Sequence, residues 1–252
     1  MKPVALGGRA MVCHCLLVET PRDGLVLVDS GFGACDLHDP KPRLGRYFAG
    51  TMGIARDPRI AAVAQVRALG HRPEDVRHIV LTHMDLDHAG GLVDFPWARV
   101  HVHRAEHEVA TTRPTVMSRQ RYRPAQWAHA PEFRTYEDRG ESWFGFDAVR
   151  AREGLPPEIL LIPTFGHSRG HSAVAVDTGD GWLLHAGDAY FDQGEVHADK
   201  RTCHPLLRVF QSIVEVDRKA RLGNQDRLRA LAKARPEVRV FSAHDAREMP
   251  EG

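Results

Sequence analysis

Four side chains able to bind a divalent metal ion fall within six residues, in the run Thr82-His83-Met84-Asp85-Leu86-Asp87-His88. The run ends an apolar stretch, residues 78–82, that is typical of a buried strand. Because residues i and i+2 at a strand end project to the same side, His83 and Asp85 are placed to hold one ion together. The chain then bends, and Asp87 with His88 can serve a neighbouring ion. The alternative is an acidic loop in which Asp87 caps a helix.

Three further residues of metal-ligand type stand where an expected strand ends. His167 lies in Thr164-Phe165-Gly166-His167, Asp188 ends His185-Ala186-Gly187-Asp188, and His244 ends Phe241-Ser242-Ala243-His244. Chance rarely places so many ligand-type side chains at strand ends, so the set favours a metal centre over the acidic loop. Other histidines have spacings that complete no site, and we expect them not to bind metal: His101, His103, His107, His129, His185, His197 and His204.

The elements that must position these residues follow from apolar periodicity and from the residues that break it. Strands are expected at residues 12–18, 25–28, 78–82, 100–102, 159–162, 173–176, 182–185 and 238–241. Helices are expected at residues 60–69, preceded by an N-cap at Asp57, and at residues 73–76, 105–110, 205–219 and 225–234. The ligand-type residues therefore fall in the loops that follow strands.

In these residues the chain resembles hydrolases of the metallo-β-lactamase fold, above all the branch of quorum-signal lactonases, glyoxalase II-like thioesterases and organophosphate hydrolases. The family pattern runs Asp-x-Gly, His-x-His-x-Asp-His, Gly-His, Gly-Asp and a late His. Its counterparts here, in the same order, are Asp29-Ser30-Gly31, the run His83 to His88, Gly166-His167, Gly187-Asp188 and His244. The resemblance implies an α/β fold, a four-layer αββα sandwich of mixed sheets with helices on the outer faces. We expect one domain over residues 1–252, with halves of about 1–110 and 155–252.

The resemblance also implies a site for two divalent metal ions, with zinc as the first expectation. His83 and His167, joined by Asp85, are the implied ligands of one ion. Asp87, His88 and His244 are implied for the other, and Asp188 for a bridge between them. Asp29 and His171 are implied as residues that orient ligands, with a packed core position as the alternative.

Asp85 departs from the family pattern, which has a histidine at this position. A carboxylate is a harder ligand than imidazole, so this position favours iron or manganese as alternatives to zinc. The added negative charge makes a bound hydroxide less acidic and more nucleophilic. The opposing interpretation is that Asp85 does not bind metal at all.

The implied mechanism is hydrolysis, in which a hydroxide shared by the two ions attacks a carbonyl or phosphoryl centre. Asp87 is a candidate for moving the proton, and Tyr190 for donating a hydrogen bond to the oxyanion or, alternatively, for lining the pocket wall. The expected substrate is a small-molecule lactone, ester or thioester, with phosphoesters next. The alternatives are an iron oxidoreductase resembling sulfur dioxygenases or di-iron proteins, and a metal-binding protein with little catalysis.

Residues 111–154 form an expected insertion that is rich in arginine and aromatic residues and poor in periodicity. Arg119, Arg121 and Arg123 alternate, and a strand-like geometry would aim all three at one side. They are candidates for binding a carboxylate or phosphate on the substrate, with a solvated charged face as the alternative. The interleaved aromatic residues are expected to pack the insertion onto the core.

The overall composition of the chain narrows the classes of partner that it is expected to bind. A formal net charge of +1 gives no case for binding nucleic acid or a membrane surface, and no apolar run approaches the length of a membrane span. Four cysteines (Cys13, Cys15, Cys35 and Cys203) form no recognisable disulfide framework, and the first two are expected to be small buried hydrophobic residues. We expect a reduced cytoplasmic protein that acts on a small molecule and forms a homodimer.

Overall fold

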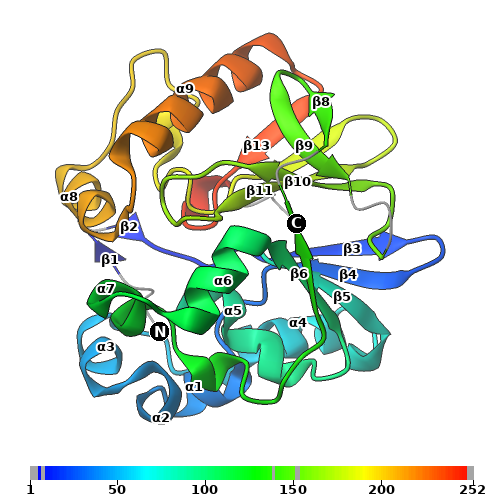
Figure 1. Cartoon of the computed structure of the whole chain (residues 1–252), viewed down its shortest axis with the longest axis vertical. Helices are drawn as coiled ribbons and strands as arrows, with labels where there is room; N and C mark the ends of the chain where they lie inside the picture. The colour runs from blue at the N-terminus through cyan, green and yellow to red at the C-terminus, as the bar shows by residue number, and fades with distance from the viewer. Residues whose placement is uncertain (1–4, 7–8, 138–139, 151–153, 249–252) are drawn as a thin grey trace.

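Two β-sheets stack face to face, and helices cover the outer face of each, so the chain forms four layers (Figure 1). The computed structural model describes residues 5–6, 9–137, 140–150 and 154–248. The first sheet has the order β3 (Leu16–Thr20), β4 (Gly24–Val28), β5 (Val76–Val80), β6 (Arg99–His103) and β7 (Phe133–Tyr136). Its β3 and β4 are antiparallel, and the other neighbours are parallel.

The second sheet has the order β13 (Val238–Phe241), β12 (Trp182–His185), β11 (Ser172–Asp177), β10 (Ile159–Pro163), β9 (Phe146–Arg150) and β8 (Glu141–Trp143). Only β12 and β13 are parallel neighbours in this sheet. A separate ribbon pairs β1 (Ala5–Leu6) with β2 (Arg9–Ala10). Both sheets are therefore mixed, as the resemblance implies.

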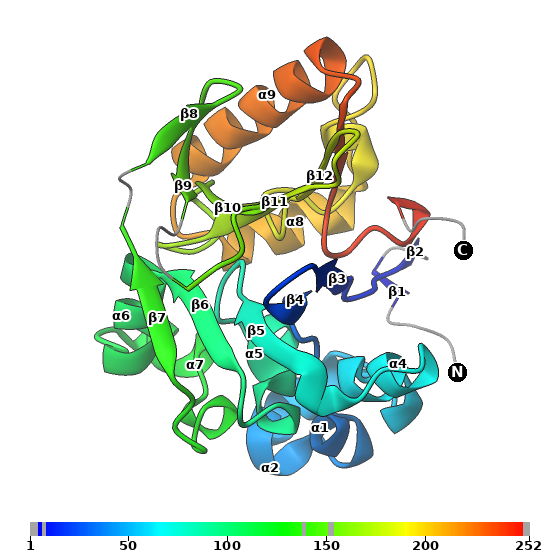
Figure 2. The same ribbon diagram turned by 90° about the vertical axis from the view of Figure 1, so that its right-hand side faces the viewer.

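Helix α9 (Arg218–Ala234) covers the outer face of the second sheet, α8 (Pro205–Val214) lies to one side of that sheet, and α1 to α4 lie outside the first sheet (Figure 2). The latter are α1 (Ala34–His38), α2 (Lys41–Leu44), α3 (Arg46–Thr51) and α4 (Ala62–Ala68). Between strands lie α5 (Leu86–Ala89), α6 (Arg104–Thr112) and α7 (Val116–Arg121). Short 3₁₀ turns occupy Pro58–Ile60, Pro73–Asp75, Gly90–Asp94, Pro124–Gln126, Gln193–Glu195 and Ala246–Glu248. Within the described residues, no helix has the length and apolar character that a bilayer crossing requires.

The alternation of side chains along each strand separates three packed cores. In β4, Val26 and Val28 pack between the sheets, whereas Leu25 and Leu27 face the helices of the first layer. In β11, Val174 and Val176 likewise face the other sheet, and the alternating alanines face the helices. A strand buried on both faces reads as a continuous apolar run, which is why the sequence identifies these strands readily.

Two sequence expectations are wrong in their boundaries, and a third is wrong about regularity. The first strand begins at Leu16 rather than at Val12, because residues 12–14 instead hydrogen-bond to the backbone of 243–244. The expected helix over residues 205–219 ends at Val214, and Asp217 caps a new helix by accepting a hydrogen bond from the Ala220 amide. Within the described part of residues 111–154, regular strands replace the expected irregular insertion, because β7 completes the first sheet while β8 and β9 extend the second.

Candidate metal centre

The carboxyl ends of five strands, β4, β5, β10, β12 and β13, bring their loops to one edge of the stacked sheets. The parallel pairs β4–β5 and β12–β13 end side by side, and β10 runs in the same direction as β12 because both are antiparallel to β11. The loops after these strands carry the residues identified from sequence, namely Asp29, the run His83 to His88, His167, Asp188 and His244.

The first group of donor atoms comes from His83, Asp85 and His167. Asp85 Oδ2 lies 3.3 Å from Nε2 of His83 and 3.1 Å from Nε2 of His167. Oδ2 of Asp188 is 3.3 Å from the same His167 nitrogen and 3.7 Å from that of His83. Atoms that each bind one ion at about 2.0–2.2 Å are separated by roughly these distances.

The second group lies on the other side of Asp188. Its Oδ1 is 3.3 Å from Nε2 of His88 and 3.1 Å from Nε2 of His244. Asp87 is more open, with its Oδ1 3.9 Å from His88 Nε2 and its Oδ2 3.7 Å from His244 Nε2. Oδ2 of Asp188 is also 3.2 Å from Nε2 of His244, so the two oxygens of this carboxylate lie between the two groups and contact both.

In two of the imidazole rings, Nδ1 contacts a group outside the cluster and Nε2 faces the carboxylates of the cluster. Nδ1 of His88 lies 2.8 Å from the Asp29 carboxylate, and Nδ1 of His244 lies 2.7 Å from the Val12 carbonyl oxygen. Both partners only accept, so each Nδ1 carries a proton, and Nε2 is the ring nitrogen available to a metal ion.

Several atoms of the cluster are buried without a hydrogen-bond partner among the described residues, including Nε2 of His83, Nε2 of His88 and Oδ1 of Asp188. Lone pairs and carboxylate oxygens repel one another at such distances unless a cation lies between them. The donors therefore fit divalent metal ions.

The electrostatics of the cluster agree with this fit. Burial, together with the charge of Arg121, lowers the pKa of His167 to about 4, which keeps this imidazole neutral and able to bind metal. Burial opposes a charge on His88, yet the carboxylates of Asp188 and Asp29 raise its pKa well above the usual value. Burial likewise opposes ionisation of Asp188, but His244 and His88 hold the pKa of that carboxyl well below its usual range. A field that attracts protons this strongly also attracts metal cations.

Asp29 and His171 lie behind the cluster and orient it. Asp29 accepts hydrogen bonds from the Thr82 amide and hydroxyl as well as from His88, and its backbone has a φ of +55°. This unfavourable backbone conformation is stabilised by those three bonds. Nε2 of His171 accepts the Asp188 amide at 2.9 Å while its Nδ1 donates to the Thr164 carbonyl oxygen at 2.9 Å.

Gly187, just before Asp188, is required by the same arrangement. Its φ is +54°, and a Cβ there would stand 2.6 Å from Nε2 of His171. A side chain at this position would therefore displace the ring that positions the Asp188 backbone.

The Asp85 carboxylate is held by Arg121, an arrangement that the sequence analysis did not anticipate. Nε of Arg121 donates to Oδ1 at 2.5 Å, and Nη2 donates to Oδ2 at 2.7 Å. Nη1 also donates to the carbonyl oxygens of His167 and Val214. Burial opposes the charge of Asp85, but Arg121 and His83 hold its pKa well below the usual range. The pair is neutral overall, so the extra negative charge expected from an aspartate at this position is cancelled.

The expected strand-like alternation of Arg119, Arg121 and Arg123 is wrong. Residues 116–121 form the helix α7, whose N-cap is Thr115 in a capping box with Ser118. Arg119 is exposed and Arg121 points to Asp85, so the three side chains do not share one face. Arg121 is neither a free handle for substrate nor part of a solvated face.

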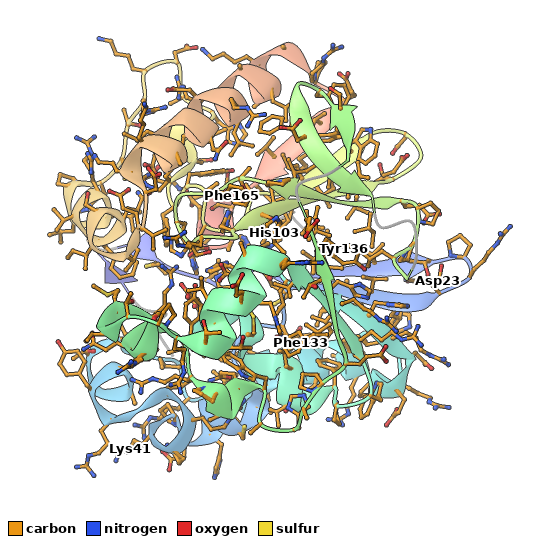
Figure 3. All side chains as sticks on the ribbon, in the orientation of Figure 1. Asp23, Lys41, His103, Phe133, Tyr136 and Phe165 are labelled. Atoms are coloured by element: carbon orange, nitrogen blue, oxygen red, sulfur yellow. The ribbon has the colours of Figure 1, made fainter. Side chains whose placement is uncertain are left out.

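Glu106, in the first turn of α6, joins the loops on both sides of the first donor group. Its Oε1 accepts hydrogen bonds from the Met84 amide and the Tyr122 hydroxyl, and its Oε2 accepts from the Ser168 hydroxyl and the Gly170 amide. The side chain is fully buried. The two halves also meet where the rings of His103 and Phe165 contact each other, with ring centroids 5.1 Å apart. Both side chains are labelled in Figure 3.

Tyr190 is brought to a different place. Its ring is fully buried, and its hydroxyl donates to Oε1 of Glu248 at 2.8 Å, which gives no support to a hydrogen bond on an oxyanion.

Asp87 does not cap a helix, because the N-cap of α5 is Asp85 and its side chain makes no capping bond. His101 and His185 bond to Tyr136 and to the His14 carbonyl oxygen, which agrees with their exclusion as ligands.

Sequence reasoning did not place three residues beside the cluster: Arg121 was expected to bind substrate, Cys13 was expected to be a small buried residue, and Glu106 was given no role. An aspartate where a neutral histidine is usual is a signal that a compensating cation is needed nearby, and this signal points to an arginine. Glu106 has no comparable signal, since a glutamate in the first turn of a helix is common on surfaces.

Known proteins of one family are similar to this chain in sequence. A sequence profile described as metallo-beta-lactamase superfamily matches residues 8–244. Two proteins named probable metallo-hydrolase, from Mycobacterium bovis and Mycobacterium tuberculosis, are each 42% identical over 239 residues, which is 94% of this chain and 76% of theirs. An N-acyl homoserine lactonase of Bacillus cereus is 25% identical over 166 residues, or 65% of this chain and 58% of the lactonase.

Solved structures show the same fold. A mutant of the lactonase AiiA from Bacillus thuringiensis, with N-decanoyl-L-homoserine bound at its active site, superposes with a TM-score of 0.68 at 22% identity, over 94% of this chain and 83% of that chain. AidC, a dizinc quorum-quenching lactonase, superposes with a TM-score of 0.60 at 17% identity, over 94% of this chain and 75% of that chain. At these identities the likeness is one of fold.

Proposed function

This chain belongs to the metallo-β-lactamase superfamily and is a metal-dependent hydrolase, and on that premise we propose that it cleaves a small-molecule lactone, ester or thioester at a dinuclear metal centre. The observation that carries the proposal is the position of Asp188 between the two donor groups. Its Oδ2 approaches Nε2 of His83 and His167, its Oδ1 approaches Nε2 of His88, and both oxygens approach Nε2 of His244. A carboxylate between two donor groups is suited to bridging two ions.

The donors are divided between two sites. His83, Asp85 and His167 would hold one ion, Asp87, His88 and His244 would hold the other, and Asp188 would touch both. Divalent ions in such a site activate water at neutral pH and polarise the bond that is cleaved.

The protein contributes proton transfer and exclusion of water. Asp87 has a side chain that is 26% exposed and is the most open of the donor carboxylates, so its oxygens are placed to take a proton from water and return it to the leaving group. Phe191 stacks on the His244 ring at 4.8 Å and lies 5.9 Å from the His167 ring. This buried aromatic ring keeps bulk water from one side of the cluster, which strengthens the electrostatic interactions there.

A lactone is the substrate class that the comparisons favour. The lactonases among the relatives are named for N-acyl homoserine lactones, and a structure of the same fold holds N-decanoyl-L-homoserine at its active site. The neutral Asp85–Arg121 pair also carries the same charge as the histidine that the family pattern has in place of Asp85, so we propose zinc rather than iron or manganese for the sites.

Elemental analysis and a substrate panel test this proposal together. Protein purified without added metal is expected to contain two zinc ions per chain. It is expected to hydrolyse N-acyl homoserine lactones, aryl esters or thioesters, with loss of turnover on chelation and recovery when zinc is restored. Asp188→Asn is the informative variant, because an amide nitrogen cannot bind metal and only one of the two sites keeps its oxygen ligand. One ion per chain, or an intact metal content with no hydrolysis of any ester, would overturn the proposal.

An iron oxidoreductase is the second candidate, and the observation in its favour is the Asp85 carboxylate itself. It predicts iron in the purified protein and consumption of oxygen. Because Arg121 cancels the charge of Asp85, the hydrolase remains the function that the geometry supports better.

A further inference from the structure

Cys13 lies beside the second donor group, although the sequence indicated only a small buried residue. Its Sγ is 3.7 Å from Oδ2 of Asp87, and together with Nε2 of His244 these atoms lie within 4.8 Å of one another. Two fully buried atoms with no partner among the described residues, Nε2 of His88 and Oδ1 of Asp188, border the same group.

The backbone holds Cys13 in this place. Residues 12–14 run antiparallel to the loop of His244, with the Val12 amide donating to the His244 carbonyl oxygen at 3.4 Å and the His14 amide donating to the Ala243 carbonyl oxygen at 2.9 Å. Nδ1 of His244 in turn donates to the Val12 carbonyl oxygen at 2.7 Å. The residue between these contacts is Cys13, so the backbone that fixes the His244 ring also fixes the thiol.

The distances suit a shared ion. Bonds of about 2.3 Å to sulfur and about 2.0–2.2 Å to nitrogen or oxygen in a tetrahedral site separate the donor atoms by roughly 3.3–3.6 Å. The sulfur of Cys13 lies 3.7 Å from Asp87 Oδ2, and His244 Nε2 lies 3.7 Å from the same oxygen. These two distances exceed the expected range by a few tenths of an ångström at most, and all three donor atoms lie within 4.8 Å of one another.

We propose that Cys13 is an additional ligand of the metal ion in the second site, beside Asp87, His88 and His244. This inference rests on the proposed metal centre. On binding, the thiol proton leaves to solvent and the sulfur bonds to the ion as a thiolate. A sulfur donor makes the second site softer than the first, whose donors are nitrogen and oxygen, so the second site selects zinc or cobalt over manganese.

Cobalt substitution tests the proposal directly. The metal-free protein is loaded with Co(II), and the absorption spectra of the wild type, Cys13→Ser and Cys15→Ser are compared. Cys15 is the matched control, because it stands two residues away with its thiol toward the Cys13 carbonyl oxygen rather than toward Asp87. Visible ligand-field bands report that Co(II) is bound, and a near-ultraviolet charge-transfer band reports a cobalt–thiolate bond.

We expect the charge-transfer band in the wild type and in Cys15→Ser, and its loss in Cys13→Ser with the ligand-field bands retained. The affinity for the second Co(II) ion in Cys13→Ser is expected to fall by at least about tenfold. Ligand-field bands without a charge-transfer band in the wild type would overturn the role of Cys13 and leave the metal centre standing. Absence of both bands in the wild type would instead overturn the metal centre. Both outcomes are measured on the wild type, so neither depends on a variant that folds.

Discussion

Replacing Arg121 with methionine leaves the Asp85 carboxylate without the cation that holds it. The two side chains form a bidentate pair and are only 12% and 18% exposed, so water cannot fully compensate the lost charge. The carbonyl oxygens of His167 and Val214 lose a donor as well. Methionine fills much of the same volume, so the effect reports charge and hydrogen bonding more than packing.

The magnitude follows from the burial of the pair. Two unit charges about 4 Å apart at an effective dielectric constant near 20 interact with about 4 kcal/mol. Removing one partner of a buried pair typically costs about 3–5 kcal/mol. We take the lower end, about 3 kcal/mol, because neither side chain is fully buried. For a protein of this size that corresponds to a Tm lower by roughly 6–12 °C.

Thermal unfolding with and without metal separates this mechanism from general damage. In chelator-treated protein the full loss is expected. In zinc-loaded protein the bound cation neutralises Asp85, so the loss is expected to be smaller. The control is Arg119→Met on the same helix, since Arg119 is exposed and its Nε bonds only to the Arg113 carbonyl oxygen among the partners described.

The double variant Asp85→Asn with Arg121→Met completes the test. It removes both charges, so it is expected to recover most of the stability lost in Arg121→Met. The reasoning fails if Arg121→Met is no more harmful than Arg119→Met, or if the double variant is at least as unstable as Arg121→Met alone.

Three more predictions concern Asp29 and Glu106 beside the cluster and His197 farther from it. Asp29→Asn removes the carboxylate that accepts Nδ1 of His88, and the affinity for zinc is expected to fall about 10- to 100-fold by competition with a chelator; unchanged affinity would contradict an orienting role. Glu106→Gln sets an amide donor against groups that all donate, so the free energy of unfolding in urea is expected to fall by about 1–3 kcal/mol, whereas a change within error would refute the bridging role. The hydrogen bond to Glu248 raises the pKa of His197, so its stabilisation is full below the usual histidine value and is lost as pH rises through the raised pKa. The unfolding free energy of the wild type is therefore expected to exceed that of His197→Gln at pH 6, and this difference should decrease by less than about 1 kcal/mol toward alkaline pH. A difference that increases with pH would contradict the prediction.

The strands and the order of the metal-type residues were predictable from sequence because both are local properties. Strands buried on both faces, such as β5 and β10, read as apolar runs, and a ligand-type residue just after such a run is visible without knowing where the run lies in space. The sequence predictions were wrong where an alternation over only a few residues fits either a strand or a helix. The arginines at 119, 121 and 123 alternate as in a strand, but the capping box at Thr115 begins a helix there.

What the sequence alone determined is the fold class and the set of residues from His83 to His244 that can bind metal. Only the tertiary structure decided which side chains contact one another around the cluster. Arg121 meets Asp85 across 36 residues, Glu106 meets Ser168 across 62, and Cys13 meets Asp87 across 74. Such pairs leave no period in the chain, because they depend on how two sheets and their loops stack. Asp85 therefore appeared in the sequence as an unbalanced charge, and the folded chain neutralises it with Arg121.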